Sequence, residues 1–274
     1  LTLNNTYEHF NGFLKVYMNR TNFDLLQELT NGVRYAGGTG GLKSRQEIML
    51  YGVRGKEVFT LWQGGEVIFG TDLDMTTLKN TQMTYSGLAV AGINGGKARR
   101  VWDFPDTRLF SPYTAVSHVF GQIERFHIIP SIGARYYNHD RFRDKTAPQS
   151  GLVVGYGYTN LNINYSRGVN YPTPVVLMNF VLEGAPVNNA SQYWRKIKPE
   201  VVDHYEAGIT HIFPDKGSFG ATIFRDQGRD RFQAYMFGSI PLQFNDSVGH
   251  YEIRGLEVTG TVSPMKNFEL FAGA

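Results

Sequence analysis

Apolar and polar residues alternate along most of this chain with a period of two, which is the period of a β-strand with one apolar and one polar face. The segment 126–138 shows the pattern clearly. One face of this segment carries Ile128, Pro130, Ile132, Ala134 and Tyr136. The other face carries Ser131, Gly133 and Arg135, with Ile129 and Tyr137 at its margins. Similar alternation in 161–167 and 201–213 predicts further strands of this kind.

The alternation predicts about a dozen strands. They span 1–9, 13–20, 46–61, 66–74, 109–120, 126–138, 151–158, 161–167, 201–213, 218–225, 251–262 and 268–272. Short connections with Asn-Gly, Gly-Gly, Thr-Asn or Pro-Asp-Lys-Gly join them in pairs, which is hairpin chemistry. Longer connections, at about 21–45, 75–108, 139–150, 168–200 and 226–250, separate the pairs. The charge run 225–231 predicts the start of an exposed loop.

Strict alternation of short and long connections is typical of a meander that passes back and forth through a membrane. Aromatic residues gather at strand ends, where a barrel has its interfacial girdles. In this interpretation the apolar face meets lipid and the polar face lines a lumen. A soluble β-sandwich, with the apolar faces packed together as a core, also satisfies the alternation. The number of strands and the long connections favour the barrel.

Composition narrows the classes further. The chain has 274 residues, 31 Gly, 19 Phe and 16 Tyr, and it lacks Cys, so disulfide scaffolds and thiolate metal sites are excluded. It has no apolar run near the roughly 18 residues that a membrane helix needs. The net charge of +3 comes from scattered residues, which argues against a nucleic-acid partner. The start lacks the basic and apolar segments of a signal peptide.

Three segments resemble strands of the TonB-dependent outer-membrane receptors. Segment 197–208 reads Ile-Lys-Pro-Glu-Val-Val-Asp-His-Tyr-Glu-Ala-Gly, similar to the Lys-Pro-Glu…Tyr-Glu-x-Gly strand of that family. Segment 251–258 reads Tyr-Glu-Ile-Arg-Gly-Leu-Glu-Val and resembles the Arg-Gly-x-Glu strand that follows it. Segment 165–172, Tyr-Ser-Arg-Gly-Val-Asn-Tyr-Pro, resembles the upstream Tyr-Ser-x-Gly-Phe segment. Their order and spacing agree with the family over most of 109–274.

The resemblance implies an all-β fold: a transmembrane antiparallel up-and-down β-barrel of about 22 strands, with a plug domain inside it. About twelve strands are found here. We find no plug or TonB box and no terminal strand ending in Phe, and Ala274 falls in mid-strand. We therefore expect residues 1–274 to be one partial barrel domain, with the plug and the C-terminal strands lying outside this chain.

The resemblance also implies the function and the partners. It implies a receptor in the bacterial outer membrane that takes up a ferric siderophore or another metal chelate. A plug moved by TonB would admit this ligand. Lipid and lipopolysaccharide would surround the barrel, and no covalently bound cofactor is expected. A passive barrel channel, a barrel adhesin and a soluble carbohydrate-binding β-sandwich remain alternatives.

Candidate ligand contacts lie in the long connections, where cations and aromatic side chains mix. Such a mixture suits an anionic, aromatic chelate through ion pairs and cation–π contacts, although a solvated loop or lipopolysaccharide contacts explain it as well. The first cluster comprises Arg99, Arg100, Trp102, Phe104 and Arg108. The second cluster comprises Tyr171, Tyr193, Trp194 and Arg195, for which an interfacial girdle or loop packing is the simpler interpretation.

Four charged residues on polar strand faces are candidates for a lumen lining: Arg135, His204, Glu206 and Glu257. They could contact a ligand path or plug, or form ion pairs between neighbouring strands. Sequence motifs of hydrolases, metalloproteases and phosphate-binding loops are lacking, so no enzyme activity is expected. The seven His residues are scattered, and no metal site is predicted.

Overall fold

The computed structural model describes residues 1–29, 40–86, 97–101, 106–173, 197–237, 240–265 and 268–274. Within these ranges the chain forms a single antiparallel sheet of 14 strands. The strands are β1 (Thr2–Thr6), β2 (Phe10–Leu29), β3 (Gly40–Trp62), β4 (Gly65–Ser86), β5 (Lys97–Val101), β6 (Thr107–His118), β7 (Phe120–Gly121), β8 (Phe126–His139), β9 (Lys145–Tyr156), β10 (Thr159–Asn170), β11 (Glu200–Phe213), β12 (Gly217–Phe237), β13 (Ile240–Met265) and β14 (Phe268–Gly273).

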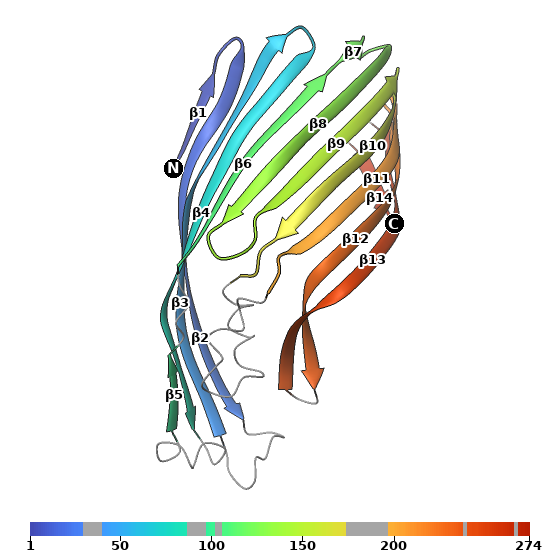
Figure 1. Ribbon diagram of the computed structural model, residues 1–274. Coiled ribbons are helices and arrows are strands. Elements are labelled where there is room, and N and C mark those ends of the chain that lie inside the picture. The colour runs from blue at the N-terminus through green and yellow to red at the C-terminus, as the bar shows by residue number, and fades with distance from the viewer. Residues whose placement is uncertain (30–39, 87–96, 102–105, 174–196, 238–239, 266–267) are drawn as a thin grey trace.

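The strands are ordered as an up-and-down meander. Each long strand pairs with its neighbour in sequence, along β1-β2-β3-β4-β6-β8-β9-β10-β11-β12-β13-β14, while β5 pairs with β4 and β7 with β8. The sheet curves into a trough in Figure 1, with β1–β4 on one side and β12–β14 on the other. The expected all-β, up-and-down architecture is therefore confirmed. The part of the chain that the structure describes contains no helix long and apolar enough to span a membrane.

The sheet has two chemically different faces. We call the face that carries Ile132 the outer face and the face that carries Arg135 the inner face. Large apolar side chains of the outer face are strongly exposed: Ile132 by 64%, Ile163 by 59% and Leu256 by 62%. In the described residues no second sheet covers them, contrary to what a β-sandwich requires. The apolar stripe therefore faces the surroundings of the protein rather than a core.

Aromatic side chains border this stripe at both ends of the strands. We call the end with the hairpin turns at 7–9, 63–64, 157–158 and 214–216 the turn end, and the opposite one the loop end. Exposed rings at the turn end include Phe126, Tyr156, Phe213 and Phe219; those at the loop end include Tyr51, Tyr136 and Tyr205. Tyr205 and Phe213 lie eight residues apart on β11. This spacing corresponds to roughly 20 Å across a membrane for a strand tilted by about 40°.

The strands reach further toward the loop end than the alternation predicts. The connection predicted at 226–250 consists mostly of strand, because β12 continues to Phe237 and β13 begins at Ile240. The charge run 225–231 accordingly lies within β12 and does not begin a loop. The connections expected at 21–45 and 139–150 shrink in the same way, since β2 ends at Leu29, β3 begins at Gly40 and β9 begins at Lys145.

Candidate functional site

The inner face is concave, so side chains from strands that are not direct neighbours can meet across it. Arg135 on β8 donates from Nη1 to Asp72 Oδ2 on β4 at 2.6 Å, past the intervening strand β6. The Arg135 guanidinium also lies 4.3 Å from the ring centroid of Tyr113 on β6 and 5.8 Å from that of Tyr137. Ion pairing and cation–π contact thus hold one arginine over three strands. We call these four residues the Arg135 cluster.

A glycine makes room for this cluster. Tyr113 lies opposite Gly70 of β4 in the strand register. A Cβ placed on Gly70 would come within 2.1 Å of the Tyr113 ring. The aromatic ring therefore covers the bare backbone of its neighbour, an arrangement in which the ring protects the glycine position of a sheet. The same pairing recurs on the inner face between Tyr251 and Gly228, where the corresponding distance is 1.9 Å.

A second polar group lies on the inner face of β10, β11 and β12. His204 Nδ1 is 2.6 Å from Asp226 Oδ1, and His204 Nε2 is 3.5 Å from Glu206 Oε2. Glu206 Oε1 in turn accepts hydrogen bonds from the amides of Asn162 and Asn164, at 3.0 and 3.2 Å. We call these five residues the His204 cluster. Its carboxylates and amides form a hydrophilic wall, on which a polar solute or a polar protein surface can bind.

Closer to the loop end, Glu200 joins β10, β11 and β13. It accepts a hydrogen bond from the Tyr251 hydroxyl at 2.8 Å and one from the Asn170 amide at 3.2 Å. The Arg231 guanidinium lies 5.0 Å from the centroid of the Tyr251 ring. These residues are not among those that the sequence pattern predicts for the site. The motif segments 197–208 and 251–258 contain Glu200 and Tyr251, but alternation alone does not show that they meet.

Tyr171, a predicted ligand contact, lies in a packed aromatic group at the loop end. Its ring centroid is 4.7 Å from that of His139 and 6.2 Å from that of Phe142, and its hydroxyl donates to the Arg143 carbonyl at 2.9 Å. Burial raises the pKa of the Tyr171 hydroxyl, because the site disfavours the phenolate. These contacts fix the Tyr171 side chain against the loop 140–144 and help to hold that loop in place.

Asp144 holds the same loop from its other side. Its carboxylate accepts hydrogen bonds from the Tyr136 hydroxyl at 2.5 Å, the Asn138 amide at 3.2 Å and the His139 backbone N–H at 3.3 Å. The hydrogen bonds from Tyr136 and Asn138 lower the pKa of Asp144, because they stabilise its charged form. The hydrogen bonds of Asp144 and the packing of Tyr171 thus hold the loop 140–144 in a defined conformation at the loop end.

The remaining predicted residues are placed as follows. Glu257 lies opposite Thr222 in the register, on the inner face, and within the described residues no hydrogen bond or ion pair engages it. Arg108 is the second residue of β6, and its backbone N–H donates to Asp140 Oδ1 at 2.9 Å. Arg99 and Arg100 belong to β5 rather than to an irregular loop. The other predicted contacts lie outside the described residues: Trp102, Phe104, Tyr193, Trp194 and Arg195.

Charge is unevenly distributed over the inner face. The side formed by β2 and β3 carries Lys15, Arg54 and Lys56, while that of β11–β13 carries Glu206, Asp226 and Glu257. Among the described residues no group of three or more His, Asp or Glu side chains could hold a metal ion.

The described strands form a single-layer antiparallel meander. Its outer face is apolar and bordered by aromatic rings, and its inner face is charged. These features define the wall of a membrane β-barrel. The family model described as "TonB dependent receptor-like, beta-barrel" matches residues 1–274. The chain therefore belongs to the TonB-dependent receptor β-barrel family, which confirms the resemblance drawn from the three strand motifs.

Solved structures share this fold. The copper transporter OprC has a TM-score of 0.62 at 14% identity, over 99% of this chain and 44% of OprC. The siderophore receptor PirA from Pseudomonas aeruginosa has a TM-score of 0.59 at 14% identity, over 96% of this chain and 51% of PirA. FpvA from P. aeruginosa, bound to heterologous pyoverdines, has a TM-score of 0.55 at 10% identity, over 99% of this chain and 38% of FpvA. No curated protein matches the sequence.

Proposed function

We propose that the protein containing this chain is a receptor of the bacterial outer membrane that takes up a ferric siderophore or a similar metal chelate, with energy supplied through TonB. The observation that carries the proposal is the two-faced sheet, because its exposed apolar stripe fits lipid and its charged concave face fits a solute path. The chain spans 44% and 51% of the first two solved relatives, so the activity concerns the whole protein.

Charge and similarity both support a metal chelate as the ligand. The structural relatives include a copper transporter and a siderophore receptor. The inner face presents guanidinium, amide and carboxylate groups in clusters, which can exchange hydrogen bonds with a chelate rich in oxygen atoms. We expect the chelate to reach this face through the loop end.

The experiment that tests this function is an uptake assay. A strain that lacks the gene, and the same strain carrying it, are given labelled ferric siderophores, copper and cobalamin, each with and without functional TonB. We expect the gene to restore uptake of one metal chelate only when TonB is functional. Uptake that does not need TonB would instead support a passive channel, and binding of cells or surfaces without uptake would support an adhesin.

The predicted ligand contacts can be tested in the same assay. We expect the combined change of Arg99, Arg100 and Trp102 to Ala to weaken ligand binding by about tenfold or more, because each charge-assisted contact contributes roughly 1.5 kcal/mol or more. The amount of folded protein in the membrane should stay unchanged. Unchanged affinity would assign these residues to lipopolysaccharide contacts or to the loop surface.

A further inference from the structure

The outer face changes from apolar to cationic at one level on two paired strands. On β12, Ile223 is followed on the same face by Arg225, and on β13, Leu256 is followed toward the loop end by Arg254. Ile223 pairs with Leu256 and Arg225 pairs with Arg254 in the register, so both steps fall side by side. The arginines therefore lie where the apolar stripe ends, on the surface that faces lipid under the proposed function.

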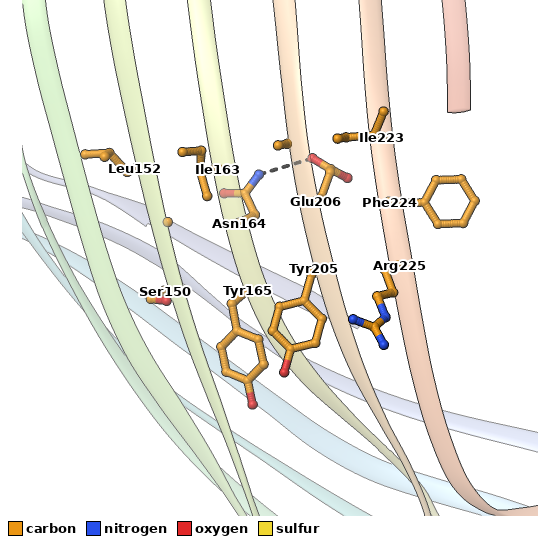
Figure 2. Close-up of a pocket in the computed structure, with 12 residues that line it drawn as sticks. Ser150, Leu152, Ile163, Asn164, Tyr165, Tyr205, Glu206, Ile223, Phe224 and Arg225 are labelled. Carbon is orange, nitrogen blue, oxygen red and sulfur yellow. Dashed lines mark hydrogen bonds between the residues drawn. The ribbon is translucent and has the colours of Figure 1, made fainter. Parts of the chain in front are cut away.

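A groove opens next to this step. It has a volume of about 580 Å³, and its lining includes Leu152, Ile163, Ala207 and Ile223. In Figure 2 the side chains of Leu152, Ile163 and Ile223 lie at one level, and those of Tyr205 and Arg225 lie at the next. The short side chain of Ala207, which pairs with Ile163 on one side and Ile223 on the other, leaves the space between them. The groove is thus apolar at one end and carries a cation at the other.

The arginines at this step are only partly neutralised. Glu252 accepts hydrogen bonds from Arg225 Nε and Nη2 at 3.0 and 2.6 Å, and it also pairs with Arg254. The side chains of Arg225 and Arg254 remain 47% and 68% exposed. Arg229 lies on the same face of β12, two positions beyond Gln227. Asp203 and Arg167 form an ion pair on the same face, beside Arg229. Four guanidinium groups and two carboxylates therefore leave a net charge of +2 on this part of the surface.

We propose that the groove and these arginines bind one lipopolysaccharide molecule, with an acyl chain of its lipid A along the groove and a lipid A phosphate on Arg225 and Arg254. The inference rests on the proposed position in the outer membrane, whose outward leaflet lies at the loop end. Guanidinium groups bind phosphate through paired hydrogen bonds, and the pairing with Glu252 already holds both arginines in place. An apolar groove that continues into a cationic patch matches an amphiphile with an anionic head.

The test compares single-charge variants of the full-length protein in detergent micelles. Native mass spectrometry measures the retention of bisphosphorylated lipid A, of lipid A without phosphate groups, and of inorganic phosphate. We expect Arg254→Gln to weaken retention of bisphosphorylated lipid A about tenfold. Lys216→Gln removes one exposed charge at the turn end, and it should leave retention unchanged. A second variant, Ala207→Phe, fills the groove and should weaken retention of both lipids.

The outcomes separate the lipid site from the proposed function. Equal retention of bisphosphorylated lipid A by Arg254→Gln and Lys216→Gln would overturn the lipid site, provided that both variants insert into membranes. Displacement of lipid A by inorganic phosphate, with Ala207→Phe having no effect, would also overturn it, because a simple anion site needs no groove. Failure of the unmodified protein to insert into lipid vesicles would instead contradict the position in the membrane, and the proposed function with it.

Discussion

At the scale of single residues, the structure shows why an aromatic side chain in a connection need not contact a ligand. The mixture of aromatic and cationic residues near Tyr171 in the sequence predicts a ligand contact there. Its hydroxyl is already used by the Arg143 carbonyl, and its ring packs on His139 and Phe142. Composition reports that an aromatic residue is present in a connection, but it does not report whether that residue is buried. Only the fold of the loop shows whether an aromatic side chain is packed inside the loop or exposed for contact with a ligand.

The Asp144 carboxylate makes the order of this loop dependent on pH. Its folded-state pKa lies below the ordinary value of 3.8, so its hydrogen bonds stabilise the loop at pH values above 3.8. That stabilisation is lost as the pH falls through the lowered pKa. We expect Asp144→Asn to speed hydrogen exchange in 139–144 at neutral pH, and the gap from the unchanged protein to narrow as the pH drops below 3.8. A gap that stays constant down to the lowest pH would contradict this role.

At the scale of elements, the sequence pattern located the strands but not their full length. The twelve predicted strands correspond to the twelve that form the main path of the sheet. The pattern fails beyond Arg225 on β12, where Asp226, Gln227 and Asp230 follow. Alternation arises because one face meets lipid, and beyond the apolar stripe both faces of a strand can be polar. Hydrogen bonding between β12 and β13 continues there without any period in hydropathy.

Two glycines on the inner face should respond differently to the same substitution. A Cβ at Gly70 would overlap the Tyr113 ring, whereas a Cβ at Gly168 meets only the Val202 carbonyl oxygen, at 3.9 Å. We expect Gly70→Ala to lower the free energy of unfolding by about 1–3 kcal/mol, since Tyr113 must leave its position under Arg135. Gly168→Ala should be neutral or stabilising by up to about 1 kcal/mol. Urea unfolding in lipid vesicles measures both, and equal values would show that Tyr113 does not cover Gly70.

At the scale of the whole molecule, the sequence indicates the chemistry of each face but not the contacts across it. Alternation placed Arg135, His204 and Glu206 on one kind of face. It could not identify Asp72 as the partner of Arg135, because 63 residues separate them and the strand β6 intervenes. Such contacts depend on the register of several strands and on the curvature of the sheet. The cationic step beside the groove was missed for the same reason, since Arg225 and Arg254 become neighbours only through the β12–β13 register.

The assignment of the two faces can be tested at adjacent positions of β8, because the chain has no cysteine and a single introduced thiol can carry a spin label. Ile132 is on the exposed apolar face, and Ser131 is on the inner face, where its hydroxyl donates to the Gly151 carbonyl at 3.4 Å. We expect a label at Ile132→Cys, in the full-length protein in vesicles, to relax with lipid-soluble oxygen more than with a water-soluble nickel chelate. The label at Ser131→Cys serves as the matched control and should show a lower ratio of oxygen to nickel effects, because it faces the hydrated interior. Equal ratios at the two positions, or the reverse order, would mean that the apolar stripe does not face lipid and that the barrel assignment of the faces is wrong.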